Sequence, residues 1–200
     1  DAEALAQAAE TIIASRPSID LVVYNAGVSH IAPFVDATEA AHRRVFEINY
    51  FAAVAMARAF LVPIRESRGA HLAISSVAGF SPLRLRTAYA ASKHAMQGFF
   101  SSLRSEEADY GVRTIIAAPS FVATNLGDAQ ATPDGVVRPG SAADGVDYMS
   151  PEAAAEVILK GLRRNRDFIP VGRVAALAWR INRLSPRAFE ALMRRKIDKA

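Results

Sequence analysis

Short apolar runs and amphipathic stretches alternate along the whole chain. The apolar runs predict buried strands, and the stretches between them, in which apolar residues recur every three or four positions, predict helices. The expected strands are 19–24, 71–75, 112–117 and 168–171, and the expected helices are 2–15, 38–61, 87–109 and 151–164. Strands that alternate with helices are typical of a parallel sheet covered on both faces, so the pattern predicts an α/β fold.

Capping and turn residues give the expected ends of several elements. Thr38 and Ser150 are suited to cap the helices that follow them. Pro63 and Gly69 are expected to stop the helix that begins at Thr38. The stretch 127–147, rich in Gly, Pro, Ala and Asp, predicts a mobile loop.

One domain accounts for this organisation. We expect it to cover residues 1–172, with a substrate loop at 125–150, and to be followed by a basic helical extension at 173–200.

The composition fits a globular protein with a large core. Hydrophobic residues make up 51% of the chain and charged residues 22%. The absence of cysteine excludes disulfides and thiol chemistry and suits a reducing compartment, so a cytoplasmic location is expected. Apolar stretches are broken before the ~20 residues of a membrane span, and the acidic, alanine-rich start is unlike a secretory signal.

Positive charge is concentrated in the last quarter of the chain. Residues 151–200 carry 12 Lys/Arg against 5 Asp/Glu, whereas the whole chain has a net charge of +4. From residue 174 onward, apolar positions are interleaved with arginine. This pattern is consistent with a solvated helix face, with a cover over a cleft or subunit contact, or with an amphipathic element on an anionic membrane. We favour cleft or subunit packing over peripheral membrane contact and expect no nucleic-acid partner.

Tyr89 and Lys93 are the first candidates for catalysis. They are four residues apart in a predicted helix and therefore share one face. A phenol has an ordinary pKa of about 10, and a neighbouring ammonium lowers it towards the range of an efficient base. On its own the pair is a weak signal, because this spacing arises by chance on many solvated helices.

Ser76 strengthens that signal. It lies thirteen residues before Tyr89, at the end of the predicted strand 71–75. Open α/β sheets bind their ligands at the carboxyl ends of the strands, where a hydroxyl can donate a hydrogen bond to a substrate oxygen. Ser75 is the neighbouring alternative, and the spacing favours Ser76.

Four motifs then occur in order along the chain. They are Asn25-Ala26-Gly27, Asn49 in the helix 38–61, Ile74-Ser75-Ser76-Val77-Ala78-Gly79, and Tyr89-Ala90-Ala91-Ser92-Lys93. With this combination the chain, over about residues 1–170, resembles the classical short-chain dehydrogenase/reductase family. The run 86–95 and Thr124-Asn125-Leu126 resemble the dehydrogenase/reductase member 7-like branch of that family. The resemblance implies a Rossmann-type doubly wound parallel sheet.

The resemblance also implies a role for each matching residue. Tyr89 would be the general acid/base, and Lys93 would lower its pKa and hydrogen-bond the nicotinamide ribose. Ser76 would polarise the substrate oxygen, and Asn49 would hold a water that relays protons. The other implied cofactor-binding residues are Asn25, Ala26, Gly27, Pro119, Ser120, Val122 and Thr124. The implied reaction is hydride transfer between NAD(P) and a carbonyl or secondary alcohol, with NADP(H) favoured over NAD(H) by the resemblance alone.

The chain departs from the family pattern at three places. Ser120 follows Pro119 where glycine is common, so its Cβ is expected to tighten the nicotinamide pocket. Tyr24 stands where a second asparagine is frequent. The Gly-rich phosphate turn of the family does not occur in these 200 residues. We therefore expect the sequence to be the retained part of a longer enzyme, and we expect these residues alone to bind the dinucleotide more weakly than micromolar.

Other functions fit the sequence less well. A serine hydrolase would need a Gly-x-Ser-x-Gly motif, and the four histidines lack the His-Glu-x-x-His spacing, so no metal site is expected. His30 is expected in a surface loop, with the substrate cleft as the alternative. A non-catalytic binding or scaffold protein of the same fold is the second hypothesis, although it would have no need of Ser76, Tyr89 and Lys93 together.

The expected substrate is a small apolar carbonyl compound or alcohol. The resemblance places Phe80, Leu83, Leu85, Phe121 and the loop 127–147 around it. The helices 38–61 and 87–109 carry many alanines that allow close helix approach and resemble the helices that pair in oligomers of the family. A homodimer or homotetramer is therefore expected.

Overall fold

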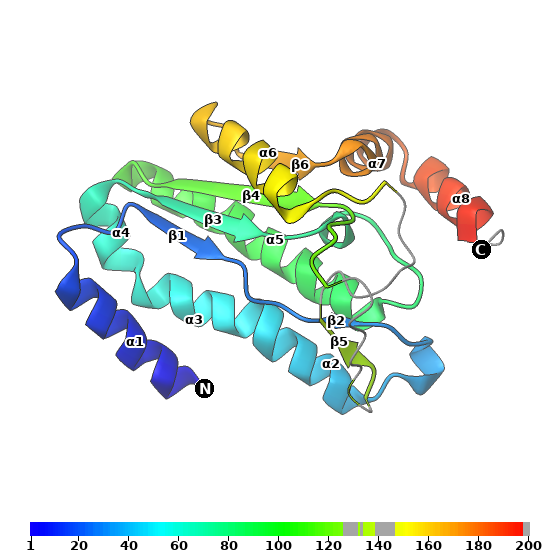
Figure 1. The fold of residues 1–200 in the computed structure, drawn as a ribbon, viewed down its shortest axis with the longest axis horizontal. Coiled ribbons are helices and arrows are strands. Elements are labelled where there is room, and N and C mark those ends of the chain that lie inside the picture. The colour runs from blue at the N-terminus through cyan, green and yellow to red at the C-terminus, as the bar shows by residue number, and fades with distance from the viewer. Residues whose placement is uncertain (126–131, 133, 139–146, 198–200) are drawn as a thin grey trace.

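A four-stranded parallel sheet forms the centre of the computed structural model, which describes residues 1–125, 132, 134–138 and 147–197 (Figure 1). In spatial order the strands are β1 (Leu21–Tyr24), β3 (Ala70–Ile74), β4 (Arg113–Pro119) and β6 (Phe168–Val171). All neighbouring pairs are parallel, so the carboxyl ends of the strands lie at one edge of the sheet. The four predicted strands are present, with ends shifted by at most two residues.

Helices cover both faces of this sheet. The helices are α1 (Ala2–Ser15), α2 (Glu39–Phe46), α3 (Ala52–Ala59), α4 (Leu61–Ser67), α5 (Thr87–Glu107), α6 (Pro151–Arg163), α7 (Arg173–Leu184) and α8 (Pro186–Ile197). Helices α1, α3, α4 and α5 share one core cluster with Val22 and Ile116 of the sheet. Helix α6 packs on the opposite face against Ile115 and Ile169. The molecule therefore has the predicted Rossmann-type α/β fold.

The predicted helix 38–61 is present as the continuous helical path Glu39–Ala59, but its centre is a π turn and the chain remains helical beyond its end. A π turn over Glu47–Phe51 separates α2 from α3, and the helical path bends by 56° before α4 continues to Ser67. Pro63 does not stop this path, because it occupies the first turn of α4, where a backbone N–H has no helical partner. Arg68, which adopts a left-handed conformation with a φ of 51°, ends α4 instead.

The predicted loop 127–147 contains a strand that the sequence pattern did not indicate. β5 (Val136–Val137) pairs in antiparallel fashion with β2 (Ser29–His30), which follows the turn after β1. Both valines are buried, so this part of the segment is held against the body of the protein. The remainder of the predicted loop lies largely outside the described residues.

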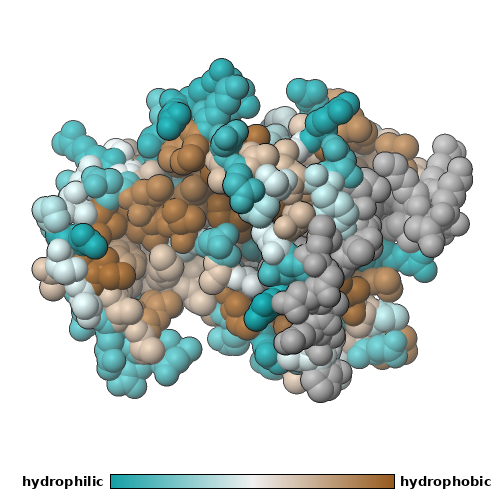
Figure 2. All heavy atoms as spheres, viewed as in Figure 1, coloured by the Kyte–Doolittle hydropathy of each residue, from teal (hydrophilic) through white to brown (hydrophobic). Residues whose placement is uncertain are grey.

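β1 forms one edge of the described sheet. Its side chains alternate, so Val22 and Tyr24 are buried whereas Leu21 and Val23 are 40% and 41% exposed. Figure 2 shows apolar side chains gathered on the visible face where Figure 1 places β1 and β3. An apolar area of the sheet and one strand edge are therefore open to solvent here.

The C-terminal segment forms two helices at the end of the sheet. Ala175 and Ala178 of α7 and Phe189 of α8 are buried in one cluster with Val77, which follows β3. Among the described residues, no single helix is both long and apolar enough to cross a membrane. Only the bent pair Glu39–Ala59 and Leu61–Ser67 meets the criteria of length and composition jointly.

Candidate active site

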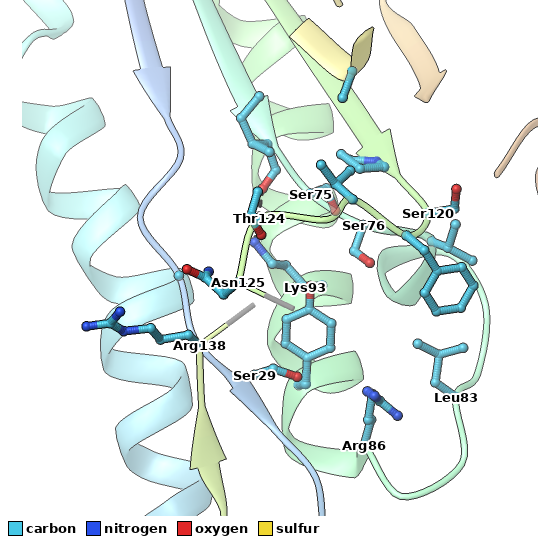
Figure 3. A pocket seen from close by; sticks show the side chains of 18 of the residues that line it. Ser29, Ser75, Ser76, Leu83, Arg86, Lys93, Ser120, Thr124, Asn125 and Arg138 are labelled. Carbon is cyan, nitrogen blue, oxygen red and sulfur yellow. Dashed lines mark hydrogen bonds between the residues drawn. The ribbon is translucent and has the colours of Figure 1, made fainter. Parts of the chain in front are cut away.

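Turns at the carboxyl edge of the sheet surround a cavity of about 750 Å³ (Figure 3). These turns follow β1, β3 and β4, and α5 closes one side. The predicted site residues that line the cavity are Asn25, Ala26, Gly27, Ser76, Tyr89, Lys93, Pro119, Ser120, Val122 and Thr124. Of the predicted catalytic and cofactor-binding residues, Asn49 alone does not line it. The fold thus brings distant segments together at the edge where parallel sheets bind ligands.

Lys93 joins α5 to the end of β3. Its side chain is buried, and its ammonium donates a hydrogen bond to the backbone carbonyl of Ile74 over 2.9 Å. Burial lowers the pKa of Lys93 to about 8. A Cβ added to Gly27 would lie 3.6 Å from Lys93 Nζ and 3.2 Å from Asn49 Oδ1. Glycine at position 27 therefore lets the turn after β1 approach the lysine closely.

Tyr89 lies one helical turn before Lys93, whose Nζ is 6.0 Å from the centre of the phenol ring. Burial raises the pKa of Tyr89, while a hydrogen bond with the Ser76 side chain and the charge of Arg86 oppose the increase only in part. The expected lowering of this pKa by Lys93 is therefore not observed, because loss of solvent outweighs the nearby charges. At neutral pH the phenol carries its proton.

The two serines after β3 have different partners. Ser76 Oγ accepts a hydrogen bond from the backbone N–H of Ala78 and lies within hydrogen-bonding reach of Tyr89. Ser75 Oγ instead accepts a hydrogen bond from Gln97 Nε2 over 3.0 Å. Both serines line the cavity, and Ser76 is the one within hydrogen-bonding reach of Tyr89.

Gln97 does not line the cavity, but it contacts the two serines that do, which the sequence analysis missed. Besides Ser75, its Nε2 donates a longer bond to the Ser76 carbonyl over 3.4 Å. Gly79 leaves space for this side chain, since a Cβ at position 79 would collide with both Gln97 and Ser75. The signal was available, because residues 89, 93 and 97 follow one another at helical spacing on the same face of α5.

Asn49 is fully buried in the π turn and acts on the protein backbone. Its Oδ1 accepts from the Val28 N–H over 2.8 Å, and its Nδ2 donates to the Val28 carbonyl and to Ser92 Oγ, each over 2.9 Å. Ser92 is the residue before Lys93. Asn49 therefore fixes the turn after β1 relative to α5, directly behind the cavity.

Ser120 is accommodated by a glycine that directly follows the neighbouring strand β6. The Ser120 hydroxyl donates a hydrogen bond to the Val171 carbonyl over 3.3 Å. A Cβ on Gly172 would lie 2.7 Å from Ser120 Oγ, and Gly172 has a φ of 96°. The departure from Pro-Gly to Pro-Ser is thus matched by Gly172 at the end of β6.

The apolar end of the cavity differs from the prediction. Leu83 and Phe121 line it, but Phe80 and Leu85 do not. Phe80 packs edge-on against Phe168, and Leu85 is 40% exposed with a φ of 60°, which turns its side chain outward. Their places are taken by residues of the C-terminal helices, namely Val174, Ala178 and Phe189.

His30 matches neither expectation made for it. It is fully buried in β2, its Nε2 lies 3.1 Å from the Asp134 carbonyl, and it is not part of the cavity lining. Arg86 and Arg138, by contrast, line the cavity and were not predicted to do so (Figure 3). A lone arginine in a loop or at a helix start carries no sequence signal for such a position.

The fold and the site define a Rossmann-type protein with a serine, a tyrosine and a lysine gathered at the carboxyl edge of its sheet. Residues 1–134 match the model of the family described as short chain dehydrogenase, and the chain belongs to this family.

Curated relatives and solved structures agree with this assignment. The chain is 33% identical over 204 residues to dehydrogenase/reductase SDR family member 7B of Xenopus laevis, covering 100% of this chain and 62% of that protein. This agrees with the branch that the sequence resembles, and the chain spans less than two thirds of that relative.

A short chain dehydrogenase from Burkholderia cenocepacia J2315, solved with NADP, superposes with a TM-score of 0.82 at 24% identity. The match covers 96% of this chain and 74% of that one. A metagenomic short-chain oxidoreductase, also solved in complex with NADP, is 30% identical with a TM-score of 0.56. In that case 60% of this chain and 55% of the other are covered.

Proposed function

We propose that the chain is the catalytic part of an NAD(P)-dependent oxidoreductase that interconverts a carbonyl compound and a secondary alcohol. The observation that carries the proposal is the convergence of Ser76, Tyr89 and Lys93 on one cavity at the carboxyl edge of the sheet. Membership of the short chain dehydrogenase family supports it.

The residues of the chain are proposed to manage the proton and the developing negative charge. Ser76 donates a hydrogen bond to the carbonyl oxygen of the substrate. Tyr89 transfers its phenolic proton to the same oxygen when a hydride is added to the carbonyl carbon. Because burial keeps Tyr89 protonated, its phenol is in the form that can act as the acid in carbonyl reduction at neutral pH. The ammonium of Lys93 stabilises the phenolate left behind, and Asn49 holds the backbone and Ser92 in place beside it.

The cavity fits the nicotinamide half of a dinucleotide. Gly27 and the turns at positions 25–27 and 119–122 form a concave wall beside Lys93, and a side chain on Gly27 would fill part of it. A reduced nicotinamide bound there would supply the hydride. We propose NADP(H) rather than NAD(H), in line with the NADP found in the Burkholderia and metagenomic structures.

The proposed substrate is a small apolar ketone or its alcohol. Leu83, Phe121, Val174 and Phe189 surround the end of the cavity beyond Ser76 and Tyr89. Such side chains favour substrates that carry alkyl or aryl groups next to the carbonyl.

The test is NADPH-dependent reduction of a panel of apolar ketones by the intact protein and two tyrosine variants. Tyr89→Phe is expected to lower kcat by on the order of a thousandfold, the scale of a lost proton donor. Tyr24→Phe is the matched control, since it also removes a phenol hydroxyl, but one that hydrogen-bonds His71 and does not line the cavity. Equal activity of Tyr89→Phe and the unaltered protein would rule out the proposed role.

A further inference from the structure

The outer face of α7 carries alternating arginine and leucine side chains. Arg173, Leu177, Arg180 and Leu184 follow one another at spacings of four, three and four residues, so they lie on one face of the helix. All four are exposed. Leu177 and Leu184, at 59% and 87% exposure, are the two most exposed leucines in the described part of the chain.

The inner face of the same helix already has its partners. Ala175 and Ala178 are buried with Val77 and Phe189, and Val174 and Ala178 line the cavity. The arginine–leucine face is therefore not needed for packing within the described structure. Two large apolar side chains on one exposed helix face are available for contact with an apolar surface outside the described structure.

The charge of this face indicates what that body is. α7 contains three arginines and no acidic residue, and Arg187 follows at the start of α8. Two copies of the chain meeting through this face would set arginine against arginine, which disfavours self-association. An anionic surface complements the arginines, and a soft one receives the two leucines without a matching pocket.

We propose that this face of α7 binds the surface of an anionic lipid bilayer. Leu177 and Leu184 enter the boundary between headgroups and acyl chains, and Arg173 and Arg180 pair with lipid phosphates. Trp179 lies beside this face, stacked on Phe168 with ring centres 5.6 Å apart and covered by the Arg183 guanidinium at 5.5 Å.

This attachment places α7 between the bilayer and the cavity. An apolar substrate that partitions into the membrane would then be concentrated next to Val174 and Phe189, which line the cavity from α7 and α8. That consequence rests on the proposed function, whereas lipid binding itself does not. A failure of vesicle binding and a failure of ketone reduction are therefore separate results.

The experiment is co-sedimentation of the chain with phosphatidylcholine vesicles that contain or lack phosphatidylserine, at low and high salt. Trp179 is the one tryptophan of the sequence, so its emission reports on the α7 surface directly. We expect binding to the anionic vesicles at low salt, a blue shift of the emission, and release at high salt.

Variants locate the binding surface. Leu177→Gln combined with Leu184→Gln is expected to weaken vesicle binding at least tenfold, because the loss of burial for one leucine alone corresponds to about tenfold. Arg173→Gln and Arg180→Gln should each weaken it by about fivefold. Val62→Gln on α4 is the matched control, since Val62 is 61% exposed but lies outside this face, and it should bind as the unaltered chain does.

Three results would overturn the proposal. They are absence of binding to phosphatidylserine vesicles at low salt, equal weakening by the control and the leucine pair, and a leucine-dependent dimer in sedimentation velocity without vesicle binding. The last result would assign the face to a protein contact. Circular dichroism of each variant shows that the fold is retained, as expected for substitutions at exposed positions.

Discussion

The ammonium nitrogen of Lys93 lies 2.9 Å from the backbone carbonyl oxygen of Ile74, the last residue of β3. This bond ties the face of α5 that carries Tyr89 and Lys93 to the strand that ends just before Ser75 and Ser76. Tyr89 and Ser76 are therefore held at a distance set by the lysine as well as by the packing of the helix. The same bond holds the Lys93 ammonium in a buried position, and burial of this charge lowers the stability of the folded protein.

Titration of Lys93 should make the stability of the protein depend on pH. Its pKa falls from 10.5 to about 8 on folding, so between these values the unfolded chain binds a proton that the folded chain does not. Stability from this group therefore rises as the pH is raised from about 8 to 10.5, by up to about 3 kcal/mol.

Lys93→Met removes the titrating group. Urea unfolding of both proteins across this pH range should show the unaltered protein gaining on the variant by that amount. Lys160→Met, at an exposed position of α6, serves as the control and should show no such gain. Parallel pH profiles for Lys93→Met and the unaltered protein would contradict the burial cost.

Gln97 should act as a positioning residue for Ser76. Gln97→Leu removes the donor to Ser75 Oγ and to the Ser76 carbonyl, which frees the turn after β3. Given the proposed reaction, kcat for ketone reduction should fall about tenfold while KM for NADPH stays within about twofold. Steady-state kinetics with both substrates varied separates the two effects.

The control for Gln97 is His94→Leu, because His94 lies on the exposed side of α5 and bonds only its own helix at Ala90. Both variants lose a polar side chain from the same helix. A rise in KM without a fall in kcat, or an equal effect at position 94, would give Gln97 a structural role only.

Local periodicity was enough to predict that Tyr89 and Lys93 lie on one face of a helix, and in the structure both line the cavity from α5. The position of Ser76 followed from the rule that ligands bind at the carboxyl ends of parallel strands. The contact between Lys93 and Ile74 could not be predicted, because it depends on how α5 packs on the sheet. The raised pKa of Tyr89 likewise depends on burial, which residue spacing does not reveal.

Contacts between distant short segments were the main omission. β2 and β5 have two residues each, too few to show a periodic pattern of apolar residues. Ser29 pairs with Val137, which lies far from it along the sequence. The sequence analysis also missed that Phe189 lines the cavity, because α8 reaches the cavity only through tertiary packing. Pro63 misled the prediction because its effect depends on its place within a helical turn.

The ion pair between Arg65 and Glu107 should stabilise the contact between α4 and α5. It is bidentate, with bonds of 2.8 Å and 2.6 Å, and the Glu107 side chain is 1% exposed. Arg65→Met would leave a buried carboxylate without its partner, and we expect the melting temperature to fall by on the order of 10 °C. Arg43→Met, which breaks the exposed pair with Glu39, should change it by only about 1 °C. Thermal scans that show similar shifts for both variants would contradict this ranking.

The buried pair of Tyr24 and His71 should make the protein sensitive to acid. Tyr24 Oη lies 2.6 Å from His71 Nδ1, and burial lowers the pKa of His71 even though Glu107 opposes this. The phenol, whose own pKa is raised by burial, therefore keeps its proton beside a neutral imidazole. Below the ordinary histidine pKa of 6.5, His71 binds a proton in the unfolded chain but not in the folded chain. The free energy of unfolding therefore decreases as the pH falls.

The slope of this loss identifies the residue. Each pH unit below about 6.5 should remove up to about 1.4 kcal/mol of unfolding free energy through His71. His71→Phe keeps an aromatic ring beside Tyr24 and removes the titration, so its unfolding free energy should depend less on pH between about 6.5 and 5. His94→Leu, which removes an exposed histidine, should keep the original slope. If the His71→Phe profile retained the full acid dependence, another buried group would have to account for it.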